Sequence, residues 1–173
     1  MGPDANPEDV GDPVDDDAED LRALAEYAAA LADGIENALP GWVERSVERI
    51  LVAYRGRVEP AERAAAAAAG AEARDRIGPQ VRTLLASDID EQRTGPLALA
   101  RRAVRYPTSV LRDAGVPPVV RDEFVERQFP DDAYDLTPAA FADLDPALHD
   151  LGLTWGAAKA HVHLVRRRRE GRR

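Results

Sequence analysis

The sequence predicts an all-α fold, in which long N-terminal helices pack on a compact half of short helices and Pro-rich turns. Only 5% of the 173 residues are aromatic, so the core has to be built from Leu, Val, Ile and many Ala residues. Alanine favours helices and suits strands poorly. Apolar residues also recur at helical spacing, and no segment alternates apolar and polar residues persuasively, as a strand would.

The length fits a single domain. We expect residues 1–15 to be a disordered acidic tail, because they are rich in Pro, Gly and Asp and have no apolar period. A single helical domain is predicted over residues 16–165, with long helices over 16–94 and short helices over 95–165. Residues 166–173, RRRREGRR, are predicted to be an Arg-rich C-terminal tail.

The first helix is predicted to begin at residue 16 and to end at Pro40, because proline lacks the backbone N–H and clashes with the preceding turn. Gly56 is expected to stop a second helix, and Pro60 to open a third. We expect Gly78-Pro79 to kink or break this third helix. A 3-4-3-4 spacing places five apolar residues on one stripe of the first helix: Leu21, Leu24, Ala28, Leu31 and Ile35.

From Pro79 a further helix is predicted to run to the breaker at Gly95-Pro96. Beyond it, Pro107 is expected to divide two short helices, and residues 117–128 to form another. The last helix is predicted to start near Thr154 and to continue into the Arg-rich tail.

Composition excludes several functional classes. The chain has no Cys, which rules out disulfides, thiolate nucleophiles and Cys-based metal sites. Its N-terminus is acidic, unlike a signal peptide, and nothing approaches 18 consecutive apolar residues. We therefore expect a soluble cytoplasmic protein without a transmembrane segment. The net charge of −9 is unevenly placed, with an acidic head and a basic tail.

The sequence contains two groups of residue types that can bind a metal, an Asp run and a His pair. In both cases the neighbouring residues indicate a structural role instead. The run Asp131–Asp135 has the DDxxD form of magnesium-diphosphate sites, but neighbouring prolines indicate an Asp-rich turn. His161 and His163 point in nearly opposite directions on a helix, and His149 is the only other histidine. No nucleotide-binding or hydrolase motif is present either. We therefore predict no metal, no cofactor and no catalytic residue.

The Arg-rich tail is the clearest basic feature. Such a run can neutralise the phosphates of nucleic acid or of anionic lipids. Two simpler interpretations are a solvated helix end and an intramolecular pairing with the acidic head. The tail residues predicted for a nucleic-acid or anionic surface are Arg166, Arg167, Arg168 and Arg169.

Of the three acids Asp88, Asp90 and Glu91, only Asp88 is placed inside an apolar stripe by the helical wheel. A partly buried carboxylate needs a partner, because an unpaired one costs several kcal/mol. Arg101 and Arg105 lie on the edge of the next helix's stripe and are the expected partners, with Arg93 a third possibility. The favoured interpretation is an ion pair that fixes how the two halves dock.

A sharper hypothesis makes the same region a ligand or peptide groove. Ionisable groups at a cleft between helices are candidate sites, although structural pairs are perturbed in the same way. The residues predicted to line this groove are Asp88, Gln92, Arg101, Arg105 and Tyr106.

The runs SDIDEQRTGPLALARRAVRYPTSVLRDAGVPPVVRDEF and FPDDAYDLTPAAFADLDPALHDLGLTWGAAKAH resemble a group of small helical proteins of actinobacteria. The similarity covers residues 75–163 or so, whereas the N-terminal part is more variable. The resemblance implies a bacterial cytoplasmic protein, and it supplies no activity, cofactor or catalytic residue.

Together these features favour a small non-catalytic helical protein with a protein-interaction or regulatory role. Its N-terminal helices, with their 3-4 stripe and Ala-rich face, could pair with a partner or with a second copy of the chain. Alternatively, the C-terminal half of the same chain fills this stripe. One alternative is a nucleic-acid-associated protein that uses the Arg tail. Another is an enzyme or ligand carrier with a polar pocket near Asp88 and Arg101.

Overall fold

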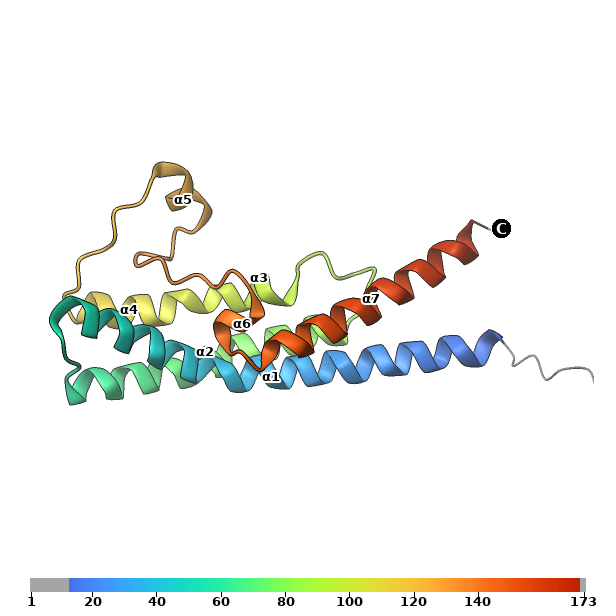
Figure 1. Ribbon diagram of the computed structural model, residues 1–173, viewed down its shortest axis with the longest axis horizontal. Coiled ribbons are helices and arrows are strands. Elements are labelled where there is room, and N and C mark those ends of the chain that lie inside the picture. The colour runs from blue at the N-terminus through green and yellow to red at the C-terminus, as the bar shows by residue number, and fades with distance from the viewer. Residues whose placement is uncertain (1–12, 172–173) are drawn as a thin grey trace, which may run out of the picture.

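The computed structural model describes residues 13–171, with side chains from residue 17 onward. This part of the chain is all-α and contains no strand, which confirms the predicted fold class (Figure 1). None of its helices combines the length and apolar character needed to cross a bilayer. The elements are α1 (Pro13–Arg55), α2 (Pro60–Ala86), α3 (Pro96–Arg101), the 3-10 turn η1 (Arg102–Val104), α4 (Arg105–Asp113), α5 (Glu123–Gln128), α6 (Phe141–Leu144) and α7 (Leu148–Glu170).

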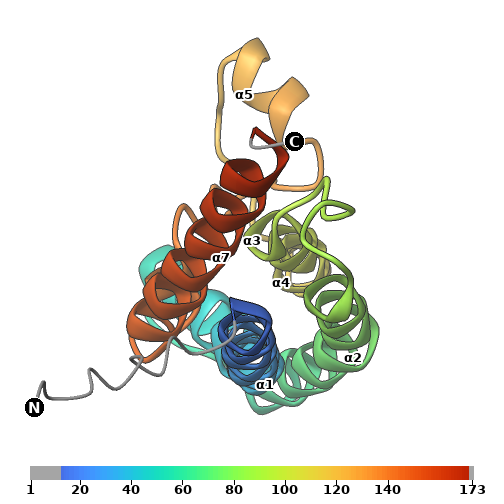
Figure 2. The same cartoon turned by 90° about the vertical axis from the view of Figure 1, so that its right-hand side faces the viewer.

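The long helices form an elongated bundle around α1. Helix α2 returns along α1, and α3, η1 and α4 follow in line and pack on α2 and α1. Helix α7 packs mainly on α1 and the short α6. The end view shows α2 and α7 on different sides of α1, with α7 set apart from α4 (Figure 2). The segment that carries α5 projects from the body of the bundle (Figure 1).

Helix α1 runs through Pro40, so the predicted end at this residue is wrong. The proline does remove one backbone hydrogen bond. However, Leu39 and Val43 on either side of it are both 0% exposed, so the core holds the two halves of the helix in place. A Cβ placed on Gly70 of α2 would lie 2.9 Å from the Cα of Pro40. Close packing of α2 against this turn therefore outweighs the lost hydrogen bond.

The predicted stops and starts around Gly56 and Pro60 are confirmed. Gly56 has a φ of +77° and ends α1, donating its N–H to the Val52 carbonyl at 2.8 Å. Pro60 is the first residue of α2, and Glu59 and Glu62 form a capping box around it. The side chain of Glu62 accepts a hydrogen bond from the Glu59 N–H at 2.9 Å.

Helix α2 contains Pro79, so the predicted break at Gly78-Pro79 is also absent. The helix then ends at Ala86, well before the predicted stop at Gly95-Pro96. Ser87 has extended backbone angles, and its N–H and hydroxyl both donate to the Leu84 carbonyl. Because a serine satisfies the helix end here, residues 88–94 form turns rather than a further helical turn.

The C-terminal half differs from the prediction in three places. Pro107 lies inside α4 and does not divide two helices. Of the helix predicted over residues 117–128, only α5 forms. The last helix begins at Leu148 instead of near Thr154.

Both predicted tails lie only partly within the described chain. Residues 13–15 of the predicted acidic tail belong to α1, and the remainder of that tail is outside the described residues. The Arg-rich run continues α7 as far as Glu170.

Candidate functional site

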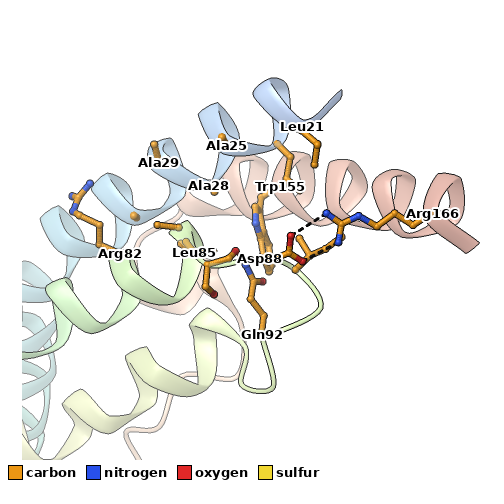
Figure 3. Close-up of a pocket in the computed structure, with 15 residues that line it drawn as sticks. Leu21, Ala25, Ala28, Ala29, Arg82, Leu85, Asp88, Gln92, Trp155 and Arg166 are labelled. Atoms are coloured by element: carbon orange, nitrogen blue, oxygen red, sulfur yellow. Dashed lines mark hydrogen bonds and ion pairs between the residues drawn. The ribbon is translucent and has the colours of Figure 1, made fainter. Parts of the chain in front are cut away.

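A groove of about 410 Å³ lies between the N-terminal half of α1, the end of α2 and α7 (Figure 3). It contains two of the residues predicted for a ligand groove, Asp88 and Gln92, and one residue predicted for an anionic surface, Arg166. The complete lining is Leu21, Leu24, Ala25, Ala28, Ala29, Ala32, Arg82, Leu85, Ala86, Ser87, Asp88, Ile89, Gln92, Trp155 and Arg166.

Alanines of α1 form one face of this groove. Ala25, Ala28, Ala29 and Ala32 are spaced i, i+3, i+4 and i+7, so they share one side of the helix. Ala28 and Ala32 are buried, whereas Ala25 and Ala29 remain exposed. Because methyl groups fill little of the space beside α1, the groove reaches close to the helix backbone. The stripe predicted as an interaction face is thus partly open.

Trp155 of α7 faces the alanines across the groove (Figure 3). Its side chain is 8% exposed. The ammonium group of Lys159 lies 5.0 Å from the centre of the Trp155 ring and donates a hydrogen bond to Gln92 Oε1 at 3.0 Å. Burial lowers the pKa of Lys159. No carboxylate partner of Lys159 is found in the described chain, so its charge is met only by an aromatic face and an amide oxygen.

Asp88 lies at the mouth of the groove, and its partner is Arg166 of α7 (Figure 3). The guanidinium group donates to both carboxylate oxygens of Asp88, at 2.8 and 3.0 Å. It also donates to the carboxylate of Asp90. These contacts join the loop after α2 to the C-terminal half of α7.

The hydrogen bonds from Arg166 hold the pKa of Asp88 at about 2, below its usual 3.8, and the Asp90 N–H adds to this effect. The same contacts raise the pKa of Arg166. Both groups are therefore charged throughout the physiological range. A carboxylate with so low a pKa is a poor general base at neutral pH.

The predicted partners of Asp88 are wrong. Arg101 donates to the carbonyls of Pro138 and Ala139, at 2.8 and 3.1 Å. Arg105 lies over the ring of Tyr106 and donates to its hydroxyl at 3.3 Å. Asp88 lies beyond the end of α2, so its side chain does not follow the helical periodicity that predicts a contact with Arg101 or Arg105.

The predicted groove residues therefore separate into two groups. Asp88 and Gln92 line the groove, whereas Arg101, Arg105 and Tyr106 do not. Sequence reasoning missed Trp155, Lys159 and the contact from Arg166. The i, i+4 spacing of Trp155 and Lys159 on a helix was the available signal for the first two.

The remaining arginines of the tail have different surroundings. Arg169 forms an ion pair with Asp17, in agreement with the predicted pairing of head and tail. His161 Nε2 lies 3.0 Å from Asp20 Oδ2 on the same side of α7. Arg167 and Arg168 are exposed, and neither has an ion pair within the described chain.

The segment Asp131–Asp135 forms a turn, as predicted. Asp132 is 1% exposed and accepts hydrogen bonds from the N–H groups of Leu136 and Thr137 and from the Thr137 hydroxyl. Burial works against ionisation of Asp132, but these hydrogen bonds prevail and its pKa is lowered. Within residues 13–171, no group of His, Asp or Glu side chains is arranged to hold a metal ion.

The chain matches no protein-family model, and no curated protein or solved structure shows significant similarity to it. The resemblance to actinobacterial proteins therefore stays a prediction.

Proposed function

We propose that the protein is a non-catalytic binding protein whose groove receives the apolar face of an amphipathic helix from a protein partner. The alanine side of α1 supports this proposal, because small side chains let another backbone approach closely. An amphipathic helix laid into an apolar groove is a common mode of peptide recognition. The volume of the groove, about 410 Å³, accommodates a small number of large apolar side chains.

Lys159 does not line the groove itself but contacts Trp155 and Gln92, which do, and it indicates the chemistry of the partner. Its ammonium group is partly buried beside Trp155 and lacks a carboxylate. Because desolvation disfavours its charged form, an acidic side chain on the partner would stabilise it. We therefore propose that the partner helix carries Leu or Ile toward the alanines and a Glu or Asp toward Lys159.

The two tryptophans of the chain provide a direct test. Trp155 of α7 lines the groove, whereas Trp42 of α1 lies outside it. Protein labelled with 5-fluorotryptophan should give two ¹⁹F resonances, which Trp155→Phe assigns. The probe is a helical peptide with Leu at i, i+3, i+4 and i+7 and Glu on the flank. We expect it to shift the Trp155 resonance saturably and to leave the Trp42 resonance in place.

Two exposed alanines form a matched pair of variants. Ala29→Arg places a long charged side chain in the groove and should abolish peptide binding, whereas Ala67→Arg on the outer side of α2 should preserve it. Replacing the flanking Glu of the peptide with Lys should weaken binding. Absence of any Trp155 shift, or binding that survives Ala29→Arg, contradicts the proposal. Light scattering then shows whether a second copy of the chain competes for the groove.

A further inference from the structure

A second cavity, of about 490 Å³, lies between the C-terminal half of α1, the loop 135–138 and Asp143 of α6. It shares no lining residue with the groove. Four of its residues come from α1: Trp42, Arg45, Ser46 and Arg49. Their spacing of i, i+3, i+4 and i+7 places them on one face of the helix. That face presents hydrogen-bond donors to the cavity.

Three of these donors have no partner within the described chain. Trp42 and Ser46 are each only 5% exposed, yet neither the indole N–H nor the serine hydroxyl makes a hydrogen bond to the protein. A serine inside a helix commonly donates to the carbonyl four residues earlier, and Ser46 does not. Arg49 has no carboxylate partner either.

These unpaired donors remain accessible from the cavity. In the described chain, the only fully enclosed side-chain polar atoms without a partner are Thr108 Oγ1 and Arg121 Nε. The donors of Trp42 and Ser46 are therefore not sealed inside the core. Because these donors border the cavity, an acceptor that enters it can bind them directly in place of solvent.

The rest of the cavity is held in place by the protein itself. Arg45 donates to the Leu144 carbonyl at 2.8 Å, which fixes its guanidinium group. The opposite loop is held by Asp132, which binds the Leu136 and Thr137 N–H groups, and by Arg101, which binds the Pro138 carbonyl. A cavity with such fixed walls needs little rearrangement to bind a ligand.

Asp135 adds an acceptor to the wall opposite α1. Its backbone is left-handed, with φ at 59°, and its carboxylate is exposed and has no ion pair in the described chain. The other carboxylate of the lining, Asp143, already accepts hydrogen bonds from the Ala139 and Ala140 N–H groups. The cavity thus combines cationic and neutral donors on α1 with one carboxylate, Asp135, that is not used by the described part of the protein itself. A simple anion would use only the α1 side.

We propose that this cavity binds a small hydroxylated anion, a phosphate ester or carboxylate of a polyol. The anionic group accepts hydrogen bonds from Arg49, Ser46 and Trp42, and Arg45 adds positive charge. A hydroxyl of the same ligand donates to Asp135. The proposal is independent of the groove, because the two sites share no residue.

The test uses the full chain labelled with 5-fluorotryptophan. Glycerol 3-phosphate, glycerate and inorganic phosphate are titrated separately, and both ¹⁹F resonances are followed. We expect glycerol 3-phosphate or glycerate to shift the Trp42 resonance saturably while the Trp155 resonance stays in place. Whichever of the two binds more tightly identifies the anionic group. If neither shifts the Trp42 resonance at millimolar concentration, the proposal is wrong.

Variants at exposed positions keep this test independent of folding. Arg49→Gln should weaken binding by about tenfold or more, because it removes a charge-assisted hydrogen bond. Arg22→Gln, an exposed arginine near the other end of α1, is the matched control and should bind as the unaltered protein does. Binding that Arg49→Gln leaves unchanged overturns the proposal.

Asp135→Asn tests the hydroxyl contact. Asn tolerates the left-handed backbone conformation, so the loop should be retained. This change should weaken glycerol 3-phosphate or glycerate relative to inorganic phosphate. An equal effect on all three probes excludes the contact between the ligand hydroxyl and Asp135, and with it the choice of a hydroxylated anion.

Discussion

Replacing Asp88 with Asn tests the contact that closes the mouth of the groove. The substitution keeps the size of the side chain but removes the negative charge that Arg166 binds through two hydrogen bonds. Asp90 remains as a second partner of Arg166, so the guanidinium group is not left unpaired. We expect a moderate loss of stability and an otherwise unchanged fold.

The pKa of Asp88 gives the magnitude. Its fall from 3.8 to about 2 corresponds to about 2.4 kcal/mol if solvent screens none of the interaction. The side chain is 49% exposed, so screening reduces this value to about 1 kcal/mol. A loss of this size lowers the midpoint of thermal unfolding by about 2–4 °C in a domain of this length.

The pH dependence has a definite sign. The pKa of Asp88 is lower in the folded state than in the unfolded state, so its contribution is complete above the unfolded value of 3.8. This contribution is lost as the pH falls from 3.8 through about 2, because the protonated carboxyl no longer attracts Arg166 as an anion does. Unfolding of the unaltered protein and of Asp88→Asn should therefore differ at pH 7 and converge in acid.

The assay is chemical or thermal unfolding, followed by circular dichroism, at a series of pH values between 7 and about 2.5. Asp75→Asn is the control, because Asp75 is exposed and, within the described residues, pairs only with the neighbouring Arg74. A difference between Asp88→Asn and the unaltered protein that stays constant over this pH range would refute the assignment to charge. If Asp88→Asn lowers the free energy of unfolding by well above about 2.4 kcal/mol, the pair of Asp88 and Arg166 is not a surface ion pair screened by solvent.

Three further changes test the packing and the buried polar groups. Asp132→Asn should destabilise the fold by about 2–4 kcal/mol, because the amide would present a donor to N–H groups that need an acceptor. Urea unfolding measures this loss, and an unchanged urea midpoint contradicts it. Gly70→Ala should cost about 1–3 kcal/mol, because its Cβ would meet the Pro40 backbone at 2.9 Å. Its control, Gly156→Ala, has open space and should raise stability by about 0.5–1 kcal/mol. Thr108→Val should stabilise the protein by about 1 kcal/mol, since the buried Thr108 hydroxyl has no partner; a lower melting temperature would argue against it.

Local periodicity was enough to predict the helical class and much of the core. Four of the five residues of the first predicted stripe are buried: Leu24, Ala28, Leu31 and Ile35. Leu21 is 45% exposed because the groove opens beside it. The end of α1 at Gly56 and the start of α2 at Pro60 depend on backbone constraints of single residues, which a sequence displays directly.

The errors arose where distant parts of the chain decide the local structure. Pro40 would end an isolated helix, but the packing of Gly70 against it depends on α2. Nothing in the local sequence requires Ser87 to cap α2, so periodicity alone continues the helix through Asp88. The partner of Asp88, Arg166, is 78 residues away in the sequence. The periodicity of the two segments does not show that they lie side by side in the fold. Of the predicted groove, only Asp88 and Gln92 line the observed one, and the contributions of α1 and α7 were not predictable from local pattern.

The two halves of α7 are attached to the bundle by different forces, and this difference explains why a groove exists. At its start, Leu148 is 2% exposed, and a Cβ on Gly34 of α1 would lie 2.6 Å from its side chain. Such close apolar packing leaves no space between the helices. Beyond Trp155, Val162 is the one buried side chain of the described part of α7, and the other contacts are mainly ionic, chiefly Arg166 with Asp88 and Arg169 with Asp17. Long side chains reach across a gap that alanines do not fill, so ionic contacts hold α7 over the groove without closing it.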